Sequence, residues 1–366
     1  GYGAGESVSS SDAVHRTVRL SNLDTGTARR IEETASSVGG NAVVSDTGIP
    51  GTYPDVSVSA TVGEFEEILD RLPEHVASVV EEALGSERSA RSSGTKVMGI
   101  LNVTPDSFYD GGRYNSLEDA VDRGMEIVEE GGDIVDVGGE STRPGADPVG
   151  VEEEKERVVP VVDRLSDEVE VPISVDTRHP EVAREALGAG AEIVNDVTGL
   201  ENPEMRRLVA DEGCRVVVMD SVDVPVDTSS EPVYDDVVDD VLRRLSERVL
   251  RARRAGVKDE QIVVDPGIGF GKGSDGDVEV LRRVNEFTSL GYPVLVGCSR
   301  KSVFGDSLDF SEEERLEPSI AANVLAASKG AGIVRVHDVE ETVRAVEVAD
   351  LLSRPGCRED SSDNDA

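Results

Sequence analysis

The 366-residue chain is poor in aromatic and sulfur-containing side chains. It has no Trp, 3 Cys and 4 Met, and Phe, Trp and Tyr make up 3% of its residues. The cysteines, Cys214, Cys298 and Cys357, are widely spaced and odd in number, so neither a disulfide framework nor a metal site of closely spaced Cys pairs is expected. We interpret Cys214 and Cys298 as buried packing residues. This cysteine usage fits a reducing compartment, and we expect a cytoplasmic protein.

Long apolar runs and positive charge are also scarce. No apolar stretch approaches the about 20 residues of a membrane helix, and no basic segment precedes an apolar one as in a secretory signal. Lys+Arg is 37 against 75 Asp+Glu, which gives a formal net charge of -38. A chain of this charge repels nucleic-acid phosphates and anionic lipid surfaces. We therefore expect neither a nucleic acid nor a membrane as a partner.

The acidic residues are spread over almost every predicted helix, as in residues 152–154 and 235–236. This distribution resembles the surfaces of proteins from halophilic organisms, where high salt screens the repulsion between like charges. An ordinary acidic cytosolic surface is the alternative interpretation.

Alternation of short apolar runs with helical segments predicts the fold of the larger part of the chain. The apolar runs are residues 97–101, 134–137, 173–175, 193–194, 216–219, 262–264, 294–296 and 333–336. The segments with helical periodicity are residues 117–130, 152–165, 180–187, 203–212, 237–255, 277–285, 317–329 and 339–351. Eight such units predict an α/β protein with a (β/α)8 TIM barrel, whose strands are buried on both faces. A doubly wound open sheet is the alternative architecture.

The remaining segments give the domain organisation. Residues 1–13 are rich in Gly and Ser and are expected to be disordered, and residues 14–84 show a β-α-β-β-α order that predicts a small α/β domain. Residues 85–95 form a linker, residues 96–353 the barrel, and residues 354–366 a disordered acidic tail. The first residue is Gly rather than Met, which is compatible with a processed product or a piece of a longer polypeptide.

Polar clusters follow nearly every predicted barrel strand, where barrel enzymes carry their chemistry. In chain order they are NVTPDSF (102–108), GGESTRPG (138–145), SVDTR (174–178), NDV (195–197), DPGIGFGK (265–272), GCSRK (297–301) and RVHD (335–338).

In these seven clusters and their order, the sequence resembles the dihydropteroate synthases of the pterin-binding family of barrels. Residues 37–45, SVGGNAVVS, are weakly similar to a small N-terminal extension found in some members. The resemblance implies a Mg²⁺-dependent transferase of folate biosynthesis that forms dihydropteroate and releases pyrophosphate. Its substrates would be a dihydropterin methyl diphosphate and 4-aminobenzoate, and its assembly a homodimer.

The resemblance also implies roles for individual residues. Lys301, Arg335 and His337 correspond to the catalytic residues, and Asn102 to the residue that helps to bind Mg²⁺. The pterin would be held by Asp176, Asn195, Met219, Asp265, Phe270 and Lys301. The 4-aminobenzoate and the diphosphate would be held by Phe108, Thr142, Arg143, Pro144, Ser299, Arg335 and His337.

Structural interpretations remain open for some of these residues. An Asp at a strand end can simply cap the following helix, and we favour that interpretation for Asp196. Phe108 can equally be a core residue. One position departs from the family: Met219 is followed by Asp220, where the family usually has His. This replacement puts in doubt only the local contact made by that His.

Three other functions are compatible with the sequence pattern. A related pterin-dependent methyltransferase would use the same barrel, although STRPG, SRK and RVHD argue against it because methyl transfer has no diphosphate to hold. A catalytically silent pterin-binding scaffold and a Schiff-base aldolase using Lys301 are the others.

We expect the folded state to depend on high salt if the acidic surface reflects adaptation to it. Removal of molar KCl should then unfold the purified protein, which circular dichroism during dialysis would detect. Full stability in dilute buffer would contradict the halophilic interpretation.

Overall fold

The computed structural model describes residues 15–20, 23–44, 54, 56–73, 76–77, 80, 94–103, 117–140, 149–222, 234–311 and 313–353. The chain divides into two compact units, Gly1–Ser89 and Ala90–Ala366. The division falls within the linker predicted at residues 85–95.

In the described ranges of the first unit, a three-stranded antiparallel sheet is accompanied by the helices α1 and α2. Its elements are β1 (His15–Leu20), α1 (Thr25–Ser37), β2 (Asn41–Val44), β3 (Val56–Thr61) and α2 (Val62–Arg71), in the predicted β-α-β-β-α order, and the strand order is β1-β3-β2. Buried residues alternate along β3, as expected for a strand with one face on a core. The core includes Ile31, Phe65 and Ile68. Thr61 and Glu64 form a capping box that fixes the start of α2.

The second unit contains eight parallel strands. They are β4 (Lys96–Asn102), β5 (Ile134–Gly138), β6 (Ile173–Asp176), β7 (Ile193–Asp196), β8 (Arg215–Met219), β9 (Ile262–Asp265), β10 (Leu295–Val296) and β11 (Ile333–Val336). Neighbours pair in the order β10-β11-β4-β5-β6-β7-β8-β9. A parallel bridge between Val264 and Val294 joins the last strand of this order to the segment that enters β10. The sheet thus closes, which confirms the predicted barrel; the open doubly wound alternative is wrong.

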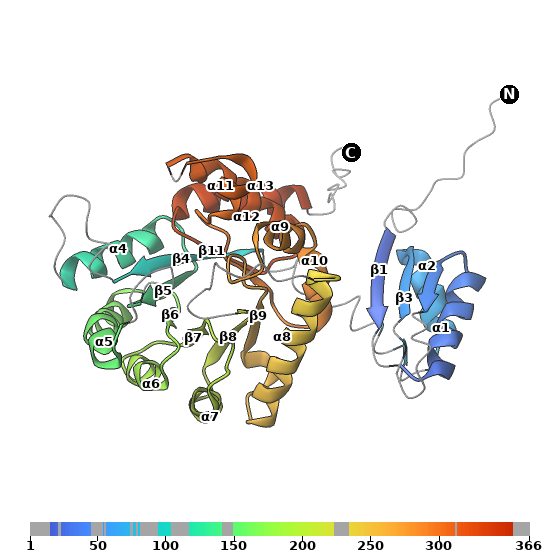
Figure 1. Cartoon of the computed structure of the whole chain (residues 1–366), viewed down its shortest axis with the longest axis horizontal. Helices are drawn as coiled ribbons and strands as arrows, with labels where there is room; N and C mark the ends of the chain where they lie inside the picture. The colour runs from blue at the N-terminus through green and yellow to red at the C-terminus, as the bar shows by residue number, and fades with distance from the viewer. Residues whose placement is uncertain are drawn as a thin grey trace, which may run out of the picture. The chain divides into compact units, whose positions relative to one another are not determined.

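Helices surround the strands of the barrel (Figure 1). The major ones are α4 (Leu117–Glu129), α5 (Val151–Glu168), α6 (Pro180–Gly188), α7 (Pro203–Glu212), α8 (Val237–Arg254), α9 (Ser274–Arg282), α12 (Leu316–Ser328) and α13 (Val339–Ser353). Among the described residues, no helix is long and apolar enough to cross a membrane.

The prediction of one helix over residues 277–285 is wrong in detail. Helix α9 ends at Arg282, and a separate short helix, α10 (Val284–Phe287), follows. Arg283 leaves the helical conformation, with φ -114° and ψ 27°, and its guanidinium bonds to Asp236 and Glu286. The sequence analysis also missed α11 (Val303–Leu308), whose six residues are too few to show helical periodicity.

The inner side of the barrel has two layers. The lower layer is an apolar cluster of Met98, Ile134, Ile193, Val217, Val263, Leu295 and Ile333. Side chains two residues apart on a strand share a face, so the next layer toward the carboxyl ends takes the residues two positions later. These include Asp136, Asn195, Met219, Asp265 and Arg335. An apolar floor therefore lies directly beneath a mostly polar layer.

The cysteines are only partly as expected. Cys298 is fully buried, as predicted, and burial raises its pKa to about 12. Cys214 is only half-buried, because it lies in the turn between α7 and β8, so its interpretation as a buried residue is wrong. Cys357 lies outside the described residues.

Candidate active site

Arg335 links two acidic residues of neighbouring strands at the carboxyl end of the barrel. Its Nε lies 2.5 Å from Asp136 Oδ2 and its Nη2 lies 2.5 Å from Asp176 Oδ2. Asp136 is fully buried, and the side chains of Arg335 and Asp176 are each 18% exposed. Burial alone would lower the pKa of Arg335, but the charges of Asp136 and Asp176 raise it, so the guanidinium stays charged. Burial raises the pKa of Asp176 to about 7, although the Arg335 charge opposes this shift.

The sequence analysis missed Asp136. The available signal was a single charged residue inside the otherwise apolar strand of residues 134–138. A charge buried in such a strand needs a partner, and in the structure that partner is Arg335.

Asn195 extends this group of side chains. Its Nδ2 donates to Asp136 Oδ2 at 3.2 Å. Within the described part of the chain, Asn195 Oδ1 and Asp136 Oδ1 are buried without a hydrogen-bond partner. Buried polar atoms are rarely left unpaired, so these two acceptors are available for the donors of a ligand.

Strand register places the predicted residues of β4 to β7 in one row. Asn102 pairs with Gly138, Gly138 with Asp176, and Asp176 with Asn195. Three of the predicted residues, far apart in the sequence, therefore belong to one row of paired positions across β4 to β7.

Asp265 and Lys301 complete the polar layer on the other side. Asp265 Oδ1 accepts the Gly267 backbone N–H at 2.7 Å, and burial raises the pKa of Asp265. Lys301 Nζ donates to the Ile268 carbonyl and lies 4.4 Å from the centre of the Phe270 ring. Burial lowers the pKa of Lys301 to about 8, against the opposing charge of Asp265. The ammonium can thus lose its proton near neutral pH.

Met219 and Phe270 form an apolar wall beside Lys301. They pack with Val197 in one buried cluster, where Met219 is 4% and Phe270 9% exposed. A thioether and a phenyl ring side by side can contact the face of a flat heterocycle.

Ser299 and His337 lie together at the ends of β10 and β11. The His337 backbone N–H donates to Ser299 Oγ at 3.2 Å, and His337 Nδ1 lies 3.1 Å from the same oxygen. Between Ser299 and Lys301, Arg300 has a left-handed φ of 54°, which is unusual for a residue with a side chain. A double hydrogen bond from Arg300 to Asp338 and a bond from its backbone N–H to Ser319 hold this conformation. Such strain is typical of functional sites.

Asp220 stands where the family usually has His, and its side chain is paired with two cations of the protein itself. Its buried carboxylate accepts from Arg244 Nε at 2.7 Å and Nη2 at 2.9 Å, and Lys272 Nζ lies 3.2 Å away. Burial would raise the pKa of Asp220, but these cations lower it below its usual value. Lys272 also donates to the carbonyls of Asp220 and Gly267, so it ties together the ends of β8 and β9.

Gly267 shows how closely these two strand ends approach. Its φ is +67°, and an added Cβ would lie 1.9 Å from the Asp220 carbonyl oxygen. Only glycine allows this contact without displacing the backbone.

Asp196 has a structural role, as favoured from the sequence, but it does not cap a helix. Its carboxylate accepts from the Thr198 backbone and hydroxyl at 2.9 and 2.7 Å and from Leu200 N at 3.0 Å. The cap of α7 is instead Asn202. The reason is that a turn at residues 197–201 separates β7 from the helix.

Four predicted residues lie outside the described part of the chain: Phe108, Thr142, Arg143 and Pro144. Their predicted roles stay predictions. All other predicted site residues are described.

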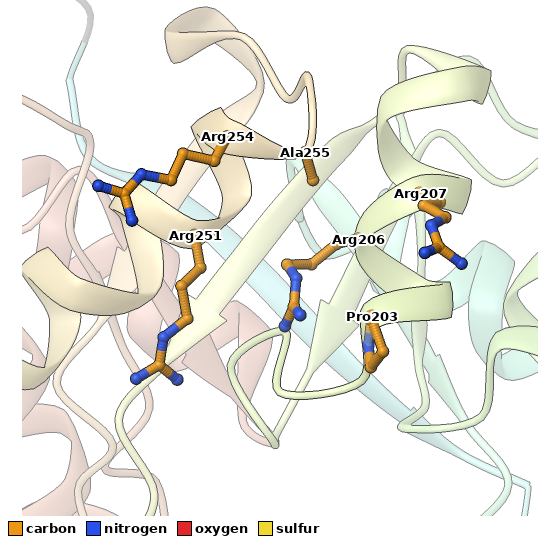
Figure 2. Close-up of a pocket in the computed structure, with 6 residues that line it drawn as sticks. All are labelled: Pro203, Arg206, Arg207, Arg251, Arg254 and Ala255. Atoms are coloured by element: carbon orange, nitrogen blue, oxygen red, sulfur yellow. The ribbon is translucent and has the colours of Figure 1, made fainter.

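A basic hollow of about 420 Å³ lies elsewhere, between α7 and the end of α8, lined by Pro203, Arg206, Arg207, Arg251, Arg254 and Ala255. Figure 2 shows its guanidinium groups spread apart rather than pointing at one centre. This hollow is separate from the polar layer inside the barrel.

Comparisons with known proteins agree with this geometry. Residues 98–337 match the family described as pterin binding enzyme. The chain is 48% identical over 254 residues to the dihydropteroate synthase of Escherichia coli, which covers 69% of this chain and 90% of that protein. The solved dihydropteroate synthase of Xanthomonas albilineans with 4-aminobenzoic acid superposes with a TM-score of 0.68 at 45% identity, covering 72% of this chain and 95% of that one.

A longer relative includes the first unit as well. The chain is 49% identical over 351 residues to a probable bifunctional folylpolyglutamate synthase/dihydropteroate synthase of Halobacterium salinarum. The match covers 92% of this chain and 43% of that protein, so the chain spans less than half of the relative's length.

We expect Asp220→Asn to destabilise the protein without weakening pterin binding. Loss of the carboxylate charge leaves Arg244 and Lys272 near one another without their shared partner, which should lower the free energy of unfolding by about 3 kcal/mol. Denaturant unfolding at high salt measures this change, and Asp163→Asn, an exposed change on α5, is the control. If pterin affinity fell instead while stability stayed constant, Asp220 would be a ligand contact.

Proposed function

Because the chain belongs to the dihydropteroate synthases of the pterin-binding enzyme family, we propose that its barrel condenses a dihydropterin methyl diphosphate with 4-aminobenzoate. The products are dihydropteroate and pyrophosphate. A relative solved with 7,8-dihydropteroate supports this assignment.

The observation that carries the proposal is the polar layer above the apolar floor of the barrel. A pterin ring presents an amide and an amino-pyrimidine edge, which carboxylates and a carboxamide bind with paired hydrogen bonds. Asp176, Asn195 and Asp265 offer these groups, and the buried Asn195 Oδ1 is among the unpaired acceptors. Lys301 donates to the ring from the opposite strand end, and Met219 and Phe270 contact its face.

The diphosphate belongs on the side of Arg335 and His337. A guanidinium binds phosphate oxygens with two parallel hydrogen bonds, and a barrel commonly binds phosphate near its last strands. Phe108, Thr142, Arg143 and Pro144 would contact the arylamine from the loops that close over it. Ser299 would bind the carboxylate of the arylamine.

Asn102 fits a role at a Mg²⁺ ion. Its side-chain carbonyl is a hard oxygen donor at the barrel rim, and Mg²⁺ is usually held by one or two protein ligands together with substrate phosphates. When bound, Mg²⁺ would neutralise charge on the departing diphosphate.

The residues then bind, orient and stabilise charge, and no protein nucleophile is needed. The bond between the pterin methylene carbon and the diphosphate oxygen breaks, and its electron pair leaves with the oxygen. The arylamine nitrogen forms the new bond to that carbon and loses a proton to solvent. Arg335 and His337 stabilise the charge that develops on the leaving group. Closure over both substrates holds the amine in line with the carbon.

The other functions are less well supported. The Escherichia coli and Xanthomonas albilineans relatives are dihydropteroate synthases, whereas a methyltransferase would leave the cluster around Arg335 and His337 without a diphosphate. The same relatives give no support to a Schiff-base aldolase that uses Lys301.

We also propose a cytoplasmic homodimer adapted to high salt. The similarity to a protein of Halobacterium salinarum and the net charge of -38 support the salt adaptation. The dimer rests on family resemblance, and size-exclusion chromatography with light scattering at high salt would test it.

We expect the purified chain to release pyrophosphate only with both substrates and Mg²⁺ at high salt. Asp136→Asn should lower kcat/KM by at least about 100-fold, because Arg335 would lose one of the two charges that orient it. The exposed Asp163→Asn is the matched control.

A folded enzyme that binds pterin but shows no turnover would instead indicate a silent scaffold. Competition between arylamines would define the second substrate.

The activity should fall as the pH rises through about 8, since the pKa of Lys301 is lowered to about 8. Lys301 donates to the pterin only while it is protonated, so its contribution is present below that pH and lost above it. The pH dependence of kcat/KM measures this limb, and Lys301→Arg should remove it because arginine stays charged. An unchanged alkaline limb in Lys301→Arg would assign the limb to another group.

A further inference from the structure

Three side chains outside the polar layer form a second group near β5 and β6. Glu140 lies two residues after β5, Glu154 lies in the first turns of α5, and His179 is the residue before α6. One carboxylate oxygen from each glutamate and one ring nitrogen of the histidine all lie within 4.8 Å of one another. The three therefore converge from three segments of the chain.

Glu154 is the unusual member of this group. Its side chain is fully buried, and within the described residues neither carboxylate oxygen has a hydrogen-bond partner. The Nε2 of His179 is also buried without a hydrogen-bond partner there. Leaving buried polar atoms unpaired costs free energy, and for a carboxylate the cost is larger still. Two unpaired groups that face each other point to a ligand between them.

The distance between these groups is informative. His179 Nε2 lies 3.8 Å from Glu154 Oε2, which is too long for a hydrogen bond. Two ligands that each lie about 2.1 Å from one ion are about 3.4 Å apart in tetrahedral geometry and at most about 4.2 Å apart. The observed separation falls within this range.

Arg178 is the positively charged partner of Glu140. It donates to Glu140 Oε1 and Oε2 at 2.8 Å each, and the Val149 N–H donates to Oε1 at 3.2 Å. Each carboxylate oxygen has two acceptor sites, so Glu140 can accept from Arg178 and still offer an oxygen to the group. Arg178 neutralises one of the two carboxylate charges, and Glu154 remains for a cation.

The position of His179 is fixed by its backbone. Its N–H donates to Thr177 Oγ1 at 3.1 Å, and Pro180 follows as the first residue of α6. Burial raises the pKa of Glu154 to about 7, and the nearby Thr177 hydroxyl opposes this shift. The imidazole is therefore presented to Glu154 by a rigid turn.

We propose that Glu140, Glu154 and His179 bind a first-row transition-metal dication that cross-links the segment after β5 to α5 and to the start of α6. One imidazole nitrogen with two carboxylate oxygens suits Zn²⁺, Mn²⁺ or Co²⁺ better than Mg²⁺, which prefers oxygen ligands alone. Water completes the coordination. The site shares no residue with the proposed Mg²⁺ position at Asn102, and the proposal does not depend on the catalytic function.

Metal binding to the tag-free, chelator-treated full chain tests the proposal. Titration with Co²⁺ or Zn²⁺ in molar KCl, which screens weak binding to the acidic surface, should give a saturable site per chain. With Co²⁺, visible absorption should report an imidazole ligand. Bound metal should also raise the melting temperature.

Variants assign the site to its residues. Glu154→Gln keeps the buried shape, and His179→Ala changes a half-buried residue, so circular dichroism can verify that each folds. Each should weaken binding by about 100-fold. Glu156→Gln, an exposed change on the same helix, and Asn102→Ala should leave the affinity unchanged.

Absence of saturable binding to the unmodified chain would overturn the proposal, as would binding that survives both Glu154→Gln and His179→Ala. Either result would mean that Glu154 is kept neutral by a proton or is paired with a charged His179. Binding lost only in Asn102→Ala would assign the metal to the proposed catalytic position and would equally overturn it.

Discussion

A guanidinium held between two carboxylates is the interaction on which the site depends. Asp136 and Asp176 come from adjacent strands, and without Arg335 two negative charges would face each other in a poorly solvated space. Arg335 lies between the two carboxyl groups and is itself oriented by them. In the proposed function, the same cation also faces the diphosphate from the position that the two acids fix. The proposed binding of the heterocycle and of the leaving group would therefore depend on one connected group of charges.

The acidity of the chain makes this arrangement more demanding. With a net charge of -38, the field of the chain would oppose the anionic substrate that we propose, so cations at the site must lie close to that substrate and away from competing surface acids. In the structure, the cations near the strand ends are withdrawn from the surface acids by burial. Lys272 and Arg244 are paired with Asp220, the residue after β8, whereas Lys301 and Arg335 belong to the polar layer itself. The replacement of the usual His by Asp220 thus adds an acid whose charge is fully occupied by its two partners and is not presented to the substrate.

The sequence predicted the barrel and most of the site because both follow from local patterns. Apolar runs that end in polar residues predict buried parallel strands, and the carboxyl ends of such strands meet at one rim, so Asp176, Asn195 and Asp265 could be grouped without knowing any contact. What escaped prediction depends on pairing across the barrel. Asp136 lies inside a strand rather than at its end, and only the position of Arg335, 199 residues away, explains its charge. The break at Arg283 and the role of Asp196 likewise depend on partners or turns that periodicity does not reveal.

Two separate groups of polar residues involve β5, β6 and the segments that follow them. Asp136 and Asp176 belong to the inner group, while Glu140 and His179 follow the same two strands and meet Glu154 of α5. Arg335 links the two strands through Asp136 and Asp176, and the proposed metal would link the segments after them a second time. Because β5 and β6 are in register at Gly138 and Asp176, a shift of one end changes the separation of the two acids that hold Arg335. A cross-link at the outer group would fix that separation before any substrate binds, which is the geometric requirement for a charge-stabilising site that does not reorganise during the reaction.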